Sequence, residues 1–293
     1  MRMFPKNVIL AFAILIILSV VLVSCGKENK EEPKAEPEVK VAEQIDTLLN
    51  AENLSYLKDS INFIEFATTL KGLKVQKTNN FGTIEQYNKT ADRSKMLIRL
   101  GMLYTDILYK RVVNGEVQTT EYDQIAQRYI KDLNLSTLIT SKFGEYLGIL
   151  TSKKNTEEQV NELKAKIQAE KYKIIETAKS TNEDFLVYFT FGGIVEALHL
   201  IVAQKDSKQF ETIVGAVKQM SGKKQFPAFK FFNRILNFVS ENPAHKEYKT
   251  YISKIQPLLD AINQKFSKNQ KLTPEERQNL IKQIETMRNE LLN

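Results

Sequence analysis

The sequence is poor in the residues from which most compact chemical sites are built. Its 293 residues include one cysteine, two histidines and no tryptophan. A single cysteine excludes a disulfide framework and any zinc or iron–sulfur site made from several thiolates. Two histidines exclude a site that needs three imidazoles. No phosphate-binding glycine loop, His-Glu-x-x-His, Gly-x-Ser-x-Gly or calcium-loop motif occurs. The sequence therefore predicts a non-enzymatic protein that holds no metal or cofactor.

The N-terminus has the pattern of a secretory signal. Arg2 and Lys6 precede an apolar run over residues 8–23, which is interrupted only by Ser19, and the sole cysteine, Cys25, follows. A helix over that run rises about 24 Å, which is short of the roughly 30 Å hydrocarbon layer of a bilayer. These features favour a cleaved signal over the alternative, an uncleaved anchor helix with an incidental cysteine.

The string Leu22-Val23-Ser24-Cys25 resembles the lipobox of bacterial lipoproteins. The resemblance implies that residues 1–24 are removed and that Cys25 is lipidated. Its acyl chains would then hold the protein on a lipid bilayer. Gly26 stands where aspartate would imply retention in the inner membrane, so the resemblance implies the outer membrane and leaves the leaflet open.

Behind the cysteine the sequence predicts a tether and one helical domain. Residues 25–42 are rich in Lys, Glu and Pro and hold too few apolar side chains to form a core. Apolar stripes at helical spacing then run through residues 43–293. We expect a single all-α domain there, an irregular bundle of roughly eight to ten helices. Residues 72–90 are polar and are expected to form a loop.

Local signals set several helix ends. Asn114-Gly115 predicts the end of one helix, and Asn155-Thr156 and Thr273-Pro274 predict the starts of two others. Pro257 should kink or split the helix in which it lies.

The segment 185–203 is apolar on nearly every side, which is typical of a membrane span or of the central helix of a bundle. Glu196, His199 and the pair Gly192-Gly193 favour the central helix, because a charge within a bilayer is costly. The two glycines would then let neighbouring helices approach closely.

Glu196 and His199 are three residues apart and therefore share one helix face. Carboxylate-bridged di-iron bundles use this spacing, but the further ligands that such a site needs are missing. We therefore expect either a buried Glu–His hydrogen bond or a pair at the rim of the bundle. If Glu196 is buried it needs a partner, and the candidates are His199, Tyr104 and Tyr188. Asp106 and Lys110 should form an exposed ion pair across one helix turn.

Two stretches, 100–109 and 191–200, resemble recurring stretches of uncharacterised helical lipoproteins from Bacteroidota-type bacteria. In those proteins the second stretch often carries tryptophan and tyrosine where Ile194 and His199 stand here. The resemblance implies a helical fold and no particular activity.

Positive charge gathers in the last third of the chain, where residues 204–293 hold 16 basic and 9 acidic side chains. Basic residues flanking a group of phenylalanines suit an anionic bilayer surface or an anionic polymer. The alternative is an ordinary bundle helix with its phenylalanines inside, although Phe231 falls off that stripe. The basic residues concerned are Lys218, Lys223, Lys224, Lys230 and Arg234.

These observations predict an envelope-anchored, non-enzymatic binding or scaffold protein. Its expected partners are the bilayer and an envelope protein or anionic polymer; a location in the envelope disfavours nucleic acid. The alternative is a bundle that binds a small ligand, a lipid or a metal through Glu196 and His199, with Tyr104 beside them.

Overall fold

The computed structural model describes residues 70–116, 119–139, 156–202, 246–267 and 270–293, together with 204, 211–212, 233–235 and 237. All of them belong to the compact unit Asp46–Asn293. Their regular structure is helical, and no β-strand occurs among them. The predicted all-α class is therefore confirmed. In chain order the elements are α4 (Ile84–Asn88), α5 (Arg93–Tyr109), the π-helical turn η2 (Lys110–Asn114), α6 (Thr120–Asp132), α8 (Glu157–Thr181), α9 (Glu183–Val202), α12 (Lys246–Ser267) and α13 (Pro274–Leu292).

Three helices begin at capping boxes written in the sequence. The side chains of Thr83, Thr156 and Thr273 each accept a hydrogen bond from the backbone amide three residues later. The Gln or Glu side chain at that later position accepts a hydrogen bond from the backbone amide of the threonine. Each box satisfies two amide groups that a helix start would otherwise leave unpaired. The predicted starts at Thr156 and Thr273 are confirmed. The predicted end at Gly115 is also confirmed, because this residue follows η2 with a left-handed φ of 72°.

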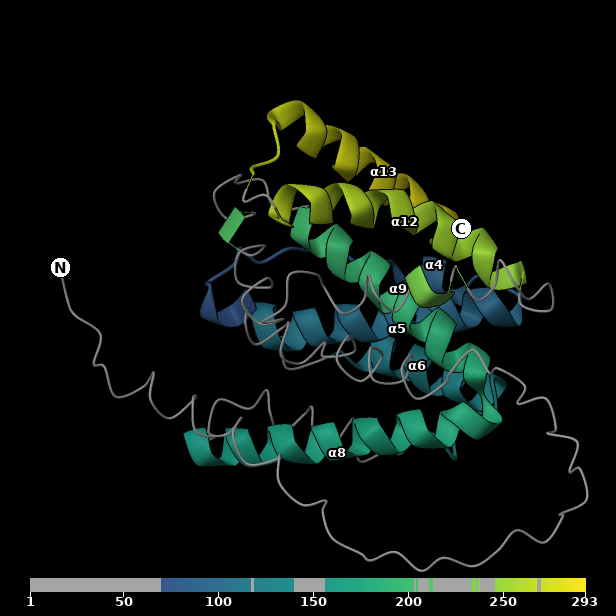
Figure 1. Ribbon diagram of the computed structural model, residues 1–293. Coiled ribbons are helices and arrows are strands. Elements are labelled where there is room, and N and C mark those ends of the chain that lie inside the picture. The colour runs from purple at the N-terminus through teal and green to yellow at the C-terminus, as the bar shows by residue number, and fades with distance from the viewer. Residues whose placement is uncertain are drawn as a thin grey trace, which may run out of the picture. The chain divides into compact units, whose positions relative to one another are not determined.

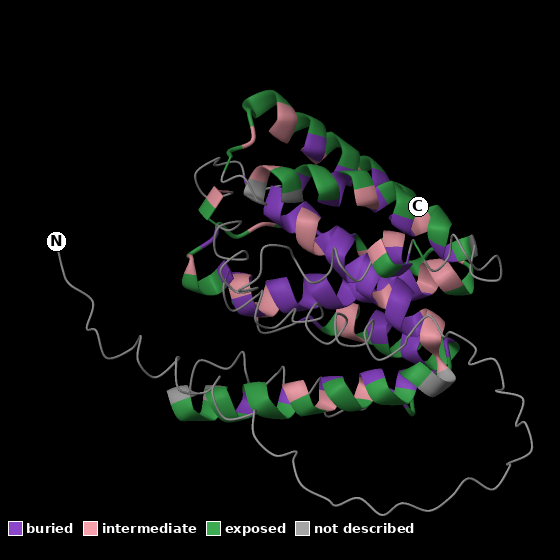
Figure 2. Ribbon diagram, in the orientation of Figure 1, coloured by how far each residue is buried: buried purple, intermediate pink, exposed green. Residues whose placement is uncertain are grey.

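Helix α9 is the central helix of the described bundle. It contacts α5, α8, α12 and α13 (Figure 1). Burial extends around most of its circumference, whereas α8 keeps a long exposed face (Figure 2). Among the described residues α9 alone is long and apolar enough to cross a membrane, and 78% of its apolar window is buried within the protein. The expectation of a buried central helix over 185–203 is confirmed.

Helices α5 and α9 touch backbone to backbone where they cross. A methyl group on Gly101 would lie 2.0 Å from the Phe189 carbonyl oxygen, and one on Gly192 would lie 1.9 Å from the Ile98 carbonyl oxygen. Real carbon and oxygen atoms do not approach so closely, so only glycine fits at either position. The predicted close approach at Gly192 is confirmed, and Gly101 is its counterpart on α5.

Two local expectations were wrong. Residues 72–90 were expected to form a loop, but this segment contains the short helix α4, whose Tyr87 is fully buried. A split at Pro257 is also wrong, because α12 continues from Lys246 to Ser267 through this proline without a break, while the kink stays a prediction. A proline removes one hydrogen bond and crowds one carbonyl. Leu258, Leu259 and Ile262 are buried beside it, and their packing holds that turn in place.

Candidate functional site

A buried ion pair joins Glu196 of α9 to Arg288 of α13. Glu196 is fully buried, and Arg288 is 5% exposed. The guanidinium Nε donates to Oε2 at 2.7 Å and to Oε1 at 3.0 Å, and Nη2 donates to Oε1 at 2.9 Å. Both carboxylate oxygens are therefore held by a fork of fixed geometry, which is the strongest form of such a pair.

The partners predicted for Glu196 from the sequence were wrong. His199, Tyr104 and Tyr188 were the expected ones, whereas the actual partner is 92 residues away along the chain. Arg288 follows Ile284 by four residues and precedes Leu291 by three, and both of these are buried. Its place on the apolar stripe of the last helix was the signal that could have identified it.

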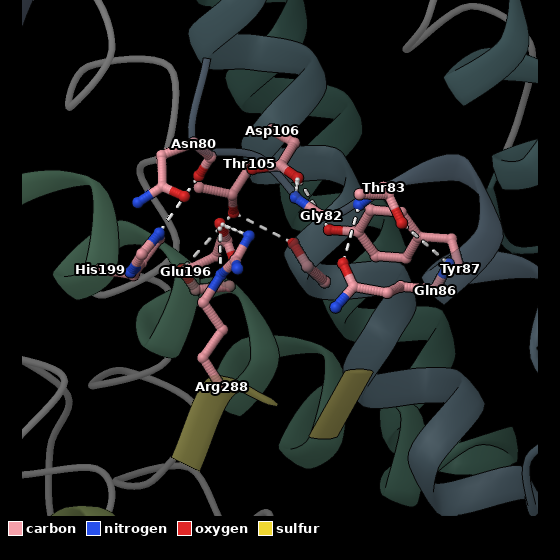
Figure 3. Close-up of polar contacts among 12 residues, drawn as sticks. Asn80, Gly82, Thr83, Gln86, Tyr87, Thr105, Asp106, Glu196, His199 and Arg288 are labelled. Atoms are coloured by element: carbon pink, nitrogen blue, oxygen red, sulfur yellow. Dashed lines mark hydrogen bonds and ion pairs between the residues drawn. The ribbon is translucent and has the colours of Figure 1, made fainter. Parts of the chain in front are cut away.

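Asp106 of α5 is the second carboxyl group of this site. Its Oδ2 accepts hydrogen bonds from the Gly82 backbone amide at 3.0 Å and from the Tyr87 hydroxyl at 2.8 Å (Figure 3). The expected exposed pair with Lys110 is wrong, because Asp106 is fully buried and Lys110 pairs with Glu116 instead. We call the four residues Tyr87, Asp106, Glu196 and Arg288 the acid junction.

Burial dominates the electrostatics of the acid junction. It raises the pKa of Asp106 well above its ordinary value, and the nearby negative charge of Glu196 raises it further while Arg288 opposes the shift. Burial likewise raises the pKa of Tyr87, with Asp106 adding to the effect. Two carboxyl groups thus face a single guanidinium in a region closed to water.

His199 lies one turn of α9 beyond Glu196 and is 2% exposed. Its Nε2 is 3.1 Å from the Asn80 carbonyl oxygen, so Nε2 carries a proton and donates. Burial lowers the pKa of His199, which favours the neutral ring. Figure 3 shows the imidazole directed at Asn80 while the Glu196 carboxylate meets Arg288. The two residues share a helix face but do not share a ligand position.

A second buried arginine ties the same helices together. Arg99 of α5 is fully buried, and its Nε donates to the Leu291 carbonyl oxygen at 2.8 Å. Its Nη1 donates to the Lys89 carbonyl oxygen at 2.7 Å. Arg99 therefore satisfies carbonyl groups at the ends of α13 and α4 that those helices cannot satisfy themselves.

Tyr104 lies at a different place from Glu196 and His199. It lines an apolar cavity of about 50 Å³ between α5, α8 and α9. Its ring meets that of Phe189 edge to face at 5.7 Å. The cavity is also lined by Ile139, Lys171, Ile174, Ile175, Phe185 and Leu186. Its volume is far below the roughly 300–1,000 Å³ of ordinary ligand pockets.

Most of the predicted surface site falls outside the described residues. Arg234 is described and exposed. Cys25, Lys218, Lys223, Lys224, Lys230 and Phe231 lie outside the part that the structure describes.

The acid junction joins side chains from four helices. Within the described ranges, no three His, Cys, Asp or Glu side chains gather as metal ligands would. Arg288 already occupies both oxygens of Glu196. The described site thus links α4, α5, α9 and α13 through charge and hydrogen bonds.

Comparison with models of known families, with curated proteins and with solved structures found no match to this chain.

Proposed function

We propose that this chain is a lipoprotein of the bacterial envelope, anchored through Cys25, whose helical body acts as a non-enzymatic binding or scaffold protein. The observation that carries the proposal is the sole cysteine, placed directly after an apolar leader in the string Leu22-Val23-Ser24-Cys25. A chain that crosses into an oxidising compartment gains from having no other thiol that could mispair.

The geometry of the described core supports a structural use of its polar groups. Glu196 and Asp106 are the acidic residues best placed for chemistry, and both are fully buried. Glu196 is engaged by Arg288, and Asp106 by Tyr87 and Gly82. A general acid or base must reach the proton that it transfers, and neither side chain reaches solvent.

A body of this kind would bind through its surface. We propose that the basic residues of the C-terminal third form that surface, because they would attract an anionic bilayer or an acidic envelope partner. The alternative of a metal site at Glu196 and His199 has less support, since the two side chains are directed at different partners.

The anchor is tested by comparing the full chain with the variant Cys25→Ala in envelope fractions. Mass spectrometry should find the wild type beginning at Cys25 with acyl adducts. The variant should keep its leader and carry no adduct, because the thioether cannot form. An intact leader on the wild-type chain, or a mature form without acyl chains, would refute the anchor.

The surface is tested separately, by flotation of the acylated full chain with vesicles. The acyl anchor alone gives some binding to any vesicle, and the basic surface should add binding to anionic vesicles. Replacing Lys223, Lys224 and Lys230 by Glu should remove this added binding. The matched control reverses Lys164, Lys173 and Lys179, which are exposed on α8. Equal losses in both triple variants would mean that net charge acts and that no particular surface does.

A further inference from the structure

The acid junction contains an oxygen atom that its surroundings do not satisfy. Oδ1 of Asp106 is buried, and no donor in the described part of the chain reaches it. The side chain of Glu196 is a hydrogen-bonding neighbour of the Asp106 side chain, and a carboxylate is itself an acceptor. Two buried carboxylates facing one another without a proton would repel, and Oδ1 of Asp106 would lack a partner.

One proton resolves this conflict. If Oδ1 of Asp106 carries a hydrogen, it becomes a donor to Glu196, while Oδ2 still accepts from Gly82 and Tyr87. The remaining negative charge then rests on Glu196, opposite the guanidinium of Arg288. The junction as a whole becomes electrically neutral, as a site sealed from water requires.

We propose that Asp106 and Glu196 bind one proton between them, held on Asp106, and that this buried proton makes the packing of α5, α9 and α13 sensitive to pH.

The groups around the proton fix its place. Tyr87 of α4 donates a hydrogen bond to Asp106, and the charge of Asp106 contributes to raising the pKa of Tyr122 of α6. Glu196 and His199 face the junction from α9, and Arg288 faces it from α13. Arg288 is the permanent cation among these described neighbours, whereas burial lowers the pKa of His199 and favours its neutral ring. Arg288 donates three hydrogen bonds to Glu196, so the negative charge is stabilised on Glu196 and the proton on Asp106.

The sign of the pH effect follows from the raised pKa of Asp106. In the unfolded chain the carboxyl titrates near pH 4, whereas in the folded chain it keeps its proton to higher pH. The stabilisation is complete below the unfolded pKa and is lost as pH rises through the folded pKa. In that window one proton is taken up on folding, so the unfolding constant should rise about tenfold for each pH unit.

Asp106→Asn is the decisive variant, because asparagine reproduces the protonated acid. Its Nδ2 can donate to Glu196 while its oxygen accepts from Gly82 and Tyr87. We will follow urea unfolding of the full chain in mild detergent by circular dichroism. Between pH 4 and the folded pKa of Asp106, we expect the unfolding constant of the wild type to rise about tenfold per pH unit relative to that of the variant. Parallel pH profiles for the two chains would overturn the proposal.

Glu196→Gln is the matched control, since it removes the other carboxyl group. If the proton is on Asp106, this variant leaves Arg288 without its counter-ion, and it should unfold much more readily at any pH at which Asp106 keeps its proton. Equal behaviour of Asp106→Asn and Glu196→Gln would contradict the assignment of the proton to Asp106.

Infrared spectroscopy detects the proton directly in the wild-type chain, so this test does not depend on whether a variant folds. The wild-type full chain at pH 7, with its aspartates labelled with carbon-13, should show the carbonyl stretch of a protonated carboxylic acid, shifted by the label. Exposed carboxyl groups are ionised at this pH and do not contribute. A spectrum in which every aspartate is ionised would refute the proposal.

Discussion

Helices α5 and α9 are joined in two ways, and the contrast shows what each kind of contact can do. At the crossing, Gly101 and Gly192 bring backbone against backbone with no room for a methyl group. At the acid junction, Asp106 and Glu196 meet through charges and a hydrogen-bond network that also includes α4 and α13. The crossing is steric and indifferent to solution conditions, whereas the junction depends on which groups are charged.

The two contacts also differ in reach. The glycine crossing specifies the distance between α5 and α9 alone. Arg288 brings α13 to the same pair of helices, and Tyr87 brings α4. A buried ion pair is weak evidence for stability by itself, because desolvation offsets much of its attraction. Its value here would lie in selecting one arrangement of helices over others.

Arg288→Met should cause the largest loss, because it leaves the charge of Glu196 buried without its counter-ion. Breaking one side of a buried pair costs about 3–5 kcal/mol of unfolding free energy. Urea unfolding followed by circular dichroism measures the loss, since the chain has no tryptophan to report by fluorescence. Lys282→Met, at an exposed position of the same helix, removes the same charge and should cost little.

Adding Glu196→Gln to Arg288→Met sharpens the same test. The double variant holds no unpaired charge at position 196, so it should recover part of the stability that the single variant loses. A double variant less stable than Arg288→Met would mean that Glu196 is held by contacts other than the guanidinium.

Gly192→Ala tests the steric side of the comparison. The added methyl group would meet the Ile98 carbonyl oxygen, and backbone cannot move aside as a flexible side chain can. Overpacking typically costs 1–3 kcal/mol, and a loss of about 3 kcal/mol is expected here, at every pH. Gly72→Ala, where nothing lies within 4 Å, is the matched control and should be nearly neutral. A tolerated alanine at position 192 would show that α5 and α9 can separate at little cost.

The sequence carried more information about the crossing than about the acid junction. The apolar run over 185–203 and its paired glycines predicted a buried helix in close contact with a neighbour, and both features are confirmed. These are properties of one segment, and helical periodicity reports them directly. Gly101 was missed because a lone glycine on an apolar helix gives no sign of which helix faces it.

The acid junction could not be predicted because its members come from four distant segments. The spacing of Asp106 and Lys110 favoured a local pair, but burial of α5 removed Asp106 from solvent and gave it Tyr87 instead. Helix α4, which supplies Tyr87, lay inside a segment interpreted as a loop. The capping box from Thr83 to Gln86 was the signal that could have identified it. Pairing of Glu196 with Arg288 required the tertiary fold itself.

The smallest expected effect, and the most discriminating one, comes from Tyr87→Phe. It removes the hydroxyl that donates to Oδ2 of Asp106 at 2.8 Å and keeps the buried ring. A hydrogen bond to a neutral acceptor contributes about 1 kcal/mol, whereas one to an ionised carboxylate contributes about 1.5–3 kcal/mol.

A double-mutant cycle with Asp106→Asn converts this difference into a measurement. If Asp106 is protonated, the loss caused by Tyr87→Phe should be about the same whether position 106 is Asp or Asn, because both present a neutral oxygen. Tyr109→Phe, which removes a hydroxyl that donates to the Gln76 carbonyl oxygen and accepts from the Gln204 side chain, is the control for a lost hydroxyl elsewhere on α5. A markedly larger loss with Asp at position 106 would mean that the carboxyl is ionised, and that the junction holds two charges of one sign.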